Sequence, residues 1–199
     1  MRAFGFALGL AAALCIGDAV AADVAPPGPR VLIQTSLGDI VLQFDAAHAP
    51  ATVANFVTYA REGHFDGTVF YRVVPGFVIQ AGSWDAAQQT RAVHPPIPLE
   101  ADNGLHNLHG AVAMARGEAP ASATAEFFID LADNTALDHQ ASDTANTTGY
   151  AVFGRVVEGM DTVDKIAAVP LGDNGPFKGA APATPVTISR VVVLPDTAP

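Results

Sequence analysis

Cysteine is almost absent from this sequence of 199 residues, which has one, Cys15. Cys15 lies within an apolar run near the start of the chain, residues 4–16. We expect that run to be removed with a secretory signal, so the mature chain would contain no cysteine. The sequence therefore predicts no disulfide, no thiol catalysis and no cysteine-ligated metal ion.

Basic residues are also scarce. The chain has 10 Lys and Arg against 20 Asp and Glu, which gives a formal net charge of −10, and half of its residues are apolar. Binding to a phosphate backbone needs clustered Lys and Arg, so this balance argues against a nucleic-acid partner. The length suggests one domain with a single core, and the composition predicts an acidic, soluble globule.

Long hydrophobic runs are missing beyond the first residues. Met1-Arg2 supplies a basic start, residues 4–16 an apolar stretch, and Ala19-Val-Ala21 a small-residue cleavage pattern, which together predict a signal peptide over 1–21. A membrane anchor is the alternative, but the run is short for a bilayer. Leu14 precedes Cys15 where a lipidated cysteine would have a small residue, so a lipid anchor is disfavoured.

These features predict export to an extracytoplasmic space, in a bacterium the periplasm, without stable membrane association. A proline-rich flexible linker is expected over 22–29, and the folded domain over 30–195.

Short alternating segments dominate the rest of the chain. They predict about eight strands, over residues 31–35, 40–44, 69–74, 77–80, 110–115, 126–130, 150–157 and 186–194. Helical spacing of apolar residues occurs twice, from Pro50 to Gly63 and from Asp161 to Pro170. Because the helices do not alternate with the strands, we expect a mainly β protein, a closed eight-stranded antiparallel barrel capped by two helices.

One arginine stands out within a pattern of two half-buried strands joined at Pro75-Gly76. Arg72 is expected to face Phe77 and Gln80 across that turn. An outward-facing strand residue is the ordinary interpretation. The alternative is a fixed guanidinium at the edge of an apolar pocket.

Four sequence blocks occur in order: Phe70-Tyr-Arg-Val-Val-Pro-Gly-Phe-Val-Ile-Gln-Ala-Gly82, Ala113-Met-Ala-Arg116, Glu126-Phe-Phe-Ile129 and Tyr150-Ala-Val-Phe-Gly154. Together they closely resemble the signature blocks of cyclophilins, the peptidyl-prolyl cis–trans isomerases. Glu100-Ala-Asp-Asn-Gly104 and Leu137-Asp138 resemble the secreted bacterial branch. The resemblance extends over residues 31–194 and implies an eight-stranded barrel with a helix at each end.

The resemblance also implies roles for individual residues. Arg72 matches the catalytic arginine, and Gln80 matches the catalytic-site glutamine that orients the arginine and contacts the substrate. The proline ring would be received by Phe77, Val78, Phe128 and Leu137. Ala115 and Arg116 match the edge that pairs with the substrate backbone, and Tyr150 stands where histidine is frequent.

Several positions depart from the family pattern. Val78 replaces a common methionine, and Ala136 stands where many members carry a tryptophan that grips cyclosporin, so weak cyclosporin binding is expected. Glu126 stands where glutamine is usual, close to Arg72 and to the substrate. If ionised, it could hold Arg72 or compete with the substrate for it, and the sequence leaves both possibilities open.

The implied function is acceleration of rotation about Xaa–Pro bonds in unfolded or flexible polypeptides, in support of the folding of exported proteins. The enzyme is expected to be a monomer without a cofactor. A proline-peptide binding module or chaperone with weak turnover is the second hypothesis, favoured by Glu126. A small-ligand carrier is the third, but the bulky residues Ile33, Leu42, Phe44 and Ile79 predict a filled barrel.

Two further predictions concern aromatic and histidine side chains. Adjacent residues of a strand point to opposite faces, so we expect Phe127 and Phe153 in the core and Phe128 in the pocket. His94, His106, His109 and His139 could suggest a metal site, but solvated loop histidines are the simpler interpretation, so no metal is predicted.

Overall fold

The computed structural model describes residues 28–140, 148–173 and 176–195. The predicted signal peptide and residues 22–27 of the predicted linker lie outside the described residues. Among the described residues, no helix has the length and apolar character that crossing a membrane requires.

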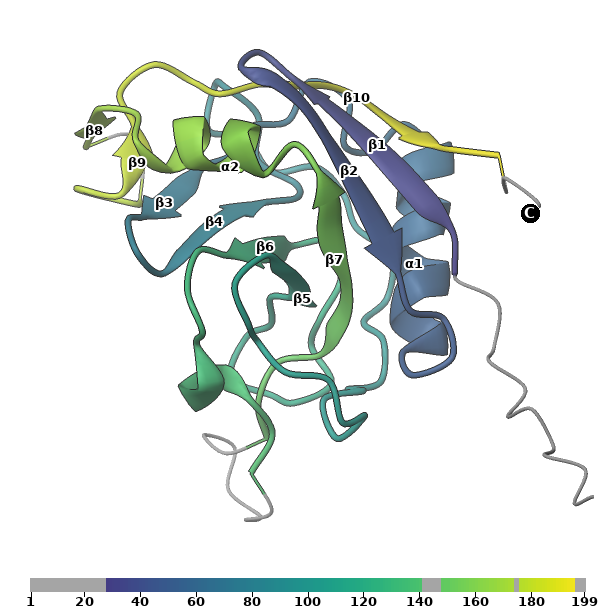
Figure 1. Cartoon of the computed structure of the whole chain (residues 1–199). Helices are drawn as coiled ribbons and strands as arrows, with labels where there is room; N and C mark the ends of the chain where they lie inside the picture. The colour runs from purple at the N-terminus through teal and green to yellow at the C-terminus, as the bar shows by residue number, and fades with distance from the viewer. Residues whose placement is uncertain (1–27, 141–147, 174–175, 196–199) are drawn as a thin grey trace, which may run out of the picture.

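Eight strands form one antiparallel sheet in the order β10-β1-β2-β7-β5-β6-β4-β3 (Figure 1). Their bounds are β1 Arg30–Thr35, β2 Gly38–Phe44, β3 Arg72–Val74, β4 Val78–Ala81, β5 Ala111–Met114, β6 Phe127–Asp130, β7 Val152–Glu158 and β10 Ile188–Val193. All eight lie within or beside predicted strands, which confirms the mainly β prediction. A separate pair, β8 (Leu171–Gly172) and β9 (Ala181–Pro182), was not predicted.

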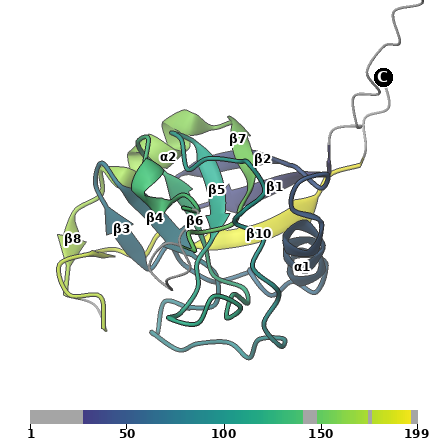
Figure 2. The same ribbon diagram turned by 90° about the horizontal axis from the view of Figure 1, so that it is seen from below.

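The prediction of a closed barrel is wrong. The sheet curls into a half-barrel, and β3 and β10 are its two ends (Figure 2). Between these ends, residues 67–70 and 186–188 make separate backbone bonds and one isolated bridge, Val69↔Thr187. The outer edge of β3 does not pair with β10: Val73 N donates instead to Ala180 O at 2.7 Å. This contact replaces the continuous β3–β10 ladder that closure would need.

Two α-helices lie on opposite sides of the curled sheet, as the two ribbon views show. α1 (Pro50–Arg61) begins with a proline, as predicted, and has no side-chain cap of its own. The carboxylate of Glu100 takes that role, accepting from Ala51 N at 3.0 Å and Thr52 N at 2.8 Å. α2 (Met160–Ala167) begins one residue before the predicted start.

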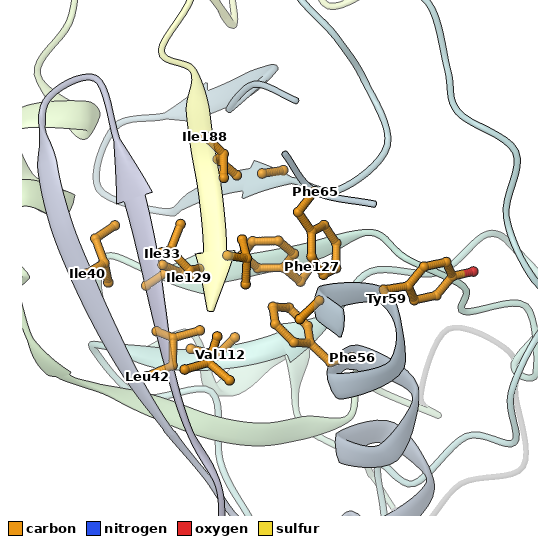
Figure 3. Close-up of a cluster of buried hydrophobic side chains, with 14 of the residues drawn as sticks. Ile33, Ile40, Leu42, Phe56, Tyr59, Phe65, Val112, Phe127, Ile129 and Ile188 are labelled. Carbon is orange, nitrogen blue, oxygen red and sulfur yellow. The ribbon is translucent and has the colours of Figure 1, made fainter. Parts of the chain in front are cut away.

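The core side chains lie between the strands and α1 (Figure 3). Phe127 and Phe153 are fully buried within it, which confirms their assignment to the core. Phe56 of α1 packs between them, with ring centroids 5.2 Å from Phe127 and 5.6 Å from Phe153. The bulky strand residues predicted to fill the interior are also fully buried or nearly so: Ile33, Leu42, Phe44 and Ile79. A sheet packed this way is a rigid support for side chains on its other face.

Candidate functional site

Three of the predicted site residues, Arg72, Gln80 and Phe128, lie in a row that crosses five strands. Antiparallel register places Arg72 opposite Gln80, Gln80 opposite Phe128, Phe128 opposite Ala113, and Ala113 opposite Val152. Directly opposed residues of a sheet share one face. The row therefore carries the guanidinium, the amide and the Phe128 ring on the same face, and backbone pairing fixes their order.

A second apolar cluster, separate from the core, lies along this row. Its buried members are Val78, Ala111, Ala113, Phe128 and Val152, and Phe77, Leu105, Ala115, Leu137 and Tyr150 pack against it while partly buried. All four residues predicted to receive the proline ring belong to this cluster. Phe127 belongs to the core instead, so the predicted separation of Phe127 and Phe128 onto opposite faces is confirmed.

Tyr150 and Arg116 border this second apolar cluster. The Tyr150 ring meets Phe128 edge-on, with centroids 5.6 Å apart, and the Arg116 guanidinium carbon lies 4.9 Å from the Tyr150 centroid. Arg116 Nε also donates to Gly149 O at 2.9 Å. Arg116 thus fixes the segment that presents Tyr150, a structural contribution that was not foreseen from the sequence.

One backbone group of Ala115 already forms a hydrogen bond within the protein. Its N–H donates to Glu126 O at 2.9 Å and extends the β5–β6 pairing by one step. That N–H is consequently unavailable to a substrate strand. Pairing of a substrate with the Ala115–Arg116 edge would have to use other backbone groups of the segment.

A chain of hydrogen bonds orients Arg72. Its Nη1 donates to Gln80 Oε1 at 3.0 Å, and Gln80 Nε2 donates to the Tyr71 hydroxyl. Among the described residues, no carboxylate lies within ion-pair distance of Arg72. The arginine is half-buried and held through a neutral partner, so its charge is not neutralised within the site.

Within the described residues, Glu126 forms no ion pair with Arg72, a contact that the sequence had left open. Its Oε1 accepts from Ser83 N at 2.8 Å, and its carboxyl group interacts with the Tyr71 hydroxyl. Burial raises the pKa of Glu126, although the bonds from Ser83 and Tyr71 oppose that effect. The side chain lies against Gly82, where an added Cβ would come within 2.5 Å of Oε2.

Polar contacts hold the loop that carries Leu137 at the end of the short 3-10 helix η1 (Thr135–Leu137). Asp138 Oδ1 accepts from Asn107 N at 2.7 Å and from Asn107 Nδ2 at 2.8 Å, and Oδ2 contacts His106 Nδ1 at 2.8 Å. Burial alone would raise the pKa of Asp138, but the bonds from Asn107 and His106 outweigh it and hold that pKa below its ordinary value. Asp138 therefore remains a charged anchor for this wall of the cluster.

A second anchor lies beneath Phe77. Asn134 Nδ2 donates to Phe77 O at 2.9 Å and to Asp130 Oδ1 at 2.7 Å. Asp130 is fully buried, and that burial raises its pKa to about 7. Asn134 and Asp130 thus connect the turn before β4 with the loop that contains η1.

Sequence reasoning missed Tyr71, Trp84 and Phe177 as neighbours of the site. Tyr71 packs on Phe177 with centroids 4.6 Å apart, and Trp84 meets Phe177 at 5.2 Å. Strict strand alternation would direct Tyr71 away from Gln80, so no local signal pointed to its hydroxyl contact.

The histidines considered as metal ligands contact different partners. His94 pairs with Glu62 at 2.7 Å, and His106 with Asp138. Within residues 28–140, 148–173 and 176–195, no group of three or more potential ligands is placed to hold a metal ion.

Comparison with known proteins agrees with this geometry. The family model described as cyclophilin type peptidyl-prolyl cis-trans isomerase matches residues 30–193. The chain is 44% identical over 165 residues to peptidyl-prolyl cis-trans isomerase A of Dickeya dadantii, covering 83% of this chain and 84% of that protein. It is also 44% identical over 163 residues to isomerase B of Escherichia coli, covering 82% of this chain and 98% of that protein.

Solved structures show the same fold. A Cryptosporidium parvum cyclophilin type peptidyl-prolyl cis-trans isomerase superposes with a TM-score of 0.71 at 20% identity, over 84% of this chain and 98% of that one. A second structure of that protein, in the presence of the dipeptide Ala-Pro, gives a TM-score of 0.70 at 21% identity, over 84% and 99%. The chain therefore belongs to the cyclophilin-type peptidyl-prolyl cis–trans isomerases, enzymes that need no cofactor.

Proposed function

We propose that Arg72 is the catalytic residue of this isomerase and that the second apolar cluster receives the proline ring. The observation that carries the proposal is the row that runs from Arg72 through Gln80 to Phe128. It offers one cation, oriented by an amide, directly beside an apolar surface. No nucleophile or metal ion is required by the chemistry that follows.

Rotation about an Xaa–Pro bond faces a barrier of about 18–20 kcal/mol because the nitrogen lone pair is delocalised into the carbonyl group. In the twisted state that delocalisation is lost, and the imide nitrogen becomes a hydrogen-bond acceptor. The guanidinium of Arg72 is permanently protonated and can donate to that nitrogen without a titration step. Catalysis then consists of stabilising the twisted state more than either planar state.

The substrate we propose is a proline within an unfolded or flexible polypeptide. Phe77, Val78, Phe128 and Leu137 would hold the ring while the preceding carbonyl group rotates. The structural relative studied with the dipeptide Ala-Pro supports this class of ligand by analogy. Glu126 and Tyr150 would border the bound chain, with Ala115 and Arg116 at its edge.

A binding module with weak turnover was the second hypothesis, and Glu126 was the residue that favoured it. The placement of that carboxyl group on Ser83 and Tyr71 leaves Arg72 available to a substrate. Active turnover is thus the better supported function of this site.

We further propose that the chain is exported to the periplasm, with a signal peptide over 1–21, a linker over 22–29 and a monomeric domain over 30–195 that assists exported proteins to fold. The small, exposed Ala136 supports weak binding of cyclosporin. Fractionation of cells expressing the full chain tests export: the mature protein should appear in the periplasmic fraction with its N-terminus near residue 22. Cytoplasmic protein retaining Met1-Arg2 would contradict this proposal.

Exchange of a short Ala–Pro peptide, followed by NMR, tests the role of Arg72. Wild type should accelerate exchange well above background, while Arg72→Ala should retain the fold and lose about 10²–10³ in kcat, the usual effect of removing one transition-state donor. Arg190→Ala, on the exposed part of β10, is the matched control and should exchange at the wild-type rate. An unchanged rate in Arg72→Ala would remove this residue from the mechanism.

A further inference from the structure

We propose that Asn134 is a positioning residue: it sets the spacing between two walls of the proline pocket, Phe77 and Leu137, and so makes the pocket select a five-membered ring. The inference rests on the proposed function, in which the second apolar cluster receives the proline ring. It adds a residue outside that cluster that fixes the width of the pocket.

The first step is the contact between Asn134 and the turn that carries Phe77. Asn134 Nδ2 donates to Phe77 O at 2.9 Å and to Asp130 Oδ1 at 2.7 Å. An amide NH₂ group has two hydrogens, so it can make both bonds. Leu131 N also donates to Phe77 O, at 2.8 Å. Two donors therefore occupy this carbonyl oxygen, one from the end of β6 and one from the residue before η1.

The second step is the contact between Asn134 and the wall that carries Leu137. Asn134 O accepts from Leu137 N at 2.8 Å, and Asn134 N donates to Asn107 O at 2.7 Å. None of the three residues of η1 is buried, so its position relative to Phe77 depends largely on polar links. Within residues 28–140, 148–173 and 176–195, the Asn134 side chain is the only group of residues 132–138 that bonds to Phe77.

The third step is the direction in which this side chain points. Asn134 occupies the N-cap position of η1, where an asparagine ordinarily bonds a backbone N–H of its own helix. Asn134 makes no such bond. Its amide instead bonds Phe77, which lies 57 positions away along the chain. Removal of the amide therefore breaks the link between the two walls without removing a cap from η1.

Loss of this link should affect binding more than rotation of the bond. Without it, Leu137 and Phe77 can move apart, and a proline ring must bring them back together, which lowers the apparent affinity. Arg72 and Gln80 are held by the pairing of β3 with β4 and by their own hydrogen bond, so the donor to the twisted imide stays in place. A loss of this kind raises KM and leaves kcat nearly unchanged.

The width of the pocket should also decide which rings are accepted. Pipecolic acid is the homologue of proline with one more methylene group in its ring. One methylene group in an apolar pocket usually changes discrimination by about 10–200-fold. Walls held by Asn134 would exclude the larger ring, whereas walls without this link would tolerate it. The preference for proline over pipecolic acid therefore reports the wall spacing, and a general loss of folded protein would leave that preference unchanged.

The test compares the exchange of Ala–Pro and Ala–pipecolic acid peptides, followed by NMR, in wild type and Asn134→Ala. Asn134→Ala should raise KM for Ala–Pro about two- to tenfold, the effect of one ordinary hydrogen bond, with kcat changed less than about twofold. Its preference for proline should fall by a similar factor. Gln43→Ala is the matched control, because Gln43 Nε2 on β2 also joins two parts of the chain by donating to Gly28 O. This variant should keep the wild-type KM and preference.

A second variant keeps the test valid if Asn134→Ala does not fold. Asn134→Ser retains one donor at the start of η1, so its KM and its preference should lie between those of wild type and Asn134→Ala, with folding checked by circular dichroism. A proline preference that is unchanged in both Asn134 variants, or that falls equally in Gln43→Ala, overturns the proposal. Failure of Phe128→Ala to raise KM would instead overturn the proposed pocket, so the two failures are distinguishable.

Discussion

The side-chain amide of Gln80 bonds two neighbours: its oxygen accepts from Arg72 Nη1 at 3.0 Å, and its nitrogen donates to the Tyr71 hydroxyl. The two strands that carry Arg72 and Gln80 are adjacent and in register, so the contact is built into the sheet. A hydrogen bond to a charged group contributes more than one between neutral groups. The orientation of the guanidinium therefore depends mainly on this amide.

Removal of that amide should be costly to turnover. We predict that Gln80→Ala lowers kcat/KM at least about tenfold, because a hydrogen bond to a charged group contributes about 1.5–3 kcal/mol. Peptide exchange by NMR measures the loss. Gln89→Ala, in the exposed loop after β4, is the matched control and should behave as the wild type. Equal rates in the two variants would show that Arg72 is oriented without Gln80.

Gly82 is required by the space that Glu126 occupies. A Cβ at position 82 would lie 2.5 Å from Glu126 Oε2 and 2.7 Å from its Cα. We predict that Gly82→Ala lowers the free energy of unfolding by about 1–3 kcal/mol, the usual effect of overpacking, as measured by urea denaturation.

The double variant Gly82→Ala/Glu126→Ala tests whether the contact with Glu126 causes the loss of stability. Removal of the carboxyl group relieves the contact with Oε2 but leaves the backbone contact, so part of the stability should return. A double variant no more stable than Gly82→Ala would assign the whole loss to the backbone.

Much of the site could be predicted from the sequence because strands repeat every two residues. That period places Arg72 and Gln80 on one face and separates Phe127 from Phe128, and the family resemblance adds their implied roles. The closed barrel was wrong because closure depends on how the two ends of the sheet meet. Here Ala180, distant in sequence, occupies the edge of β3.

The partner of Glu126 could not be predicted for a related reason. The motif placed Glu126 near Arg72. Its carboxyl group instead turns toward Ser83 N, which lies 43 positions away along the chain, and packs against Gly82. The contact of Tyr71 with Gln80 departs from regular alternation just before β3 begins. The elements β8, β9 and η1 span only two or three residues each, too short to produce a period.

Asp138 should affect substrate binding more than the chemical step. Its carboxylate accepts two bonds from Asn107 and contacts His106, so it anchors the loop that presents Leu137. We predict that Asp138→Ala raises KM several-fold, since hydrogen bonds to a charge contribute about 1.5–3 kcal/mol, with a smaller change in kcat. Asp138→Asn keeps one acceptor and should recover part of the affinity. A loss confined to kcat would contradict this assignment.

The buried Asp130 should make stability fall with rising pH. Burial raises its pKa to about 7 in the folded protein, whereas in the unfolded chain it should titrate near 3.9. A group with a raised folded-state pKa supports folding fully below its unfolded pKa, and this support is lost as pH rises through the folded value.

Wild type should therefore lose up to about 4 kcal/mol of unfolding free energy between pH 4 and pH 9 from this group. Asp130→Asn retains an acceptor for Asn134 without acquiring a charge, so its stability should decline less over the same range. Urea denaturation at several pH values measures the difference, with the exposed Asp102→Asn as the control that keeps the wild-type slope. Parallel pH curves for wild type and Asp130→Asn would mean that Asp130 is not the group that titrates.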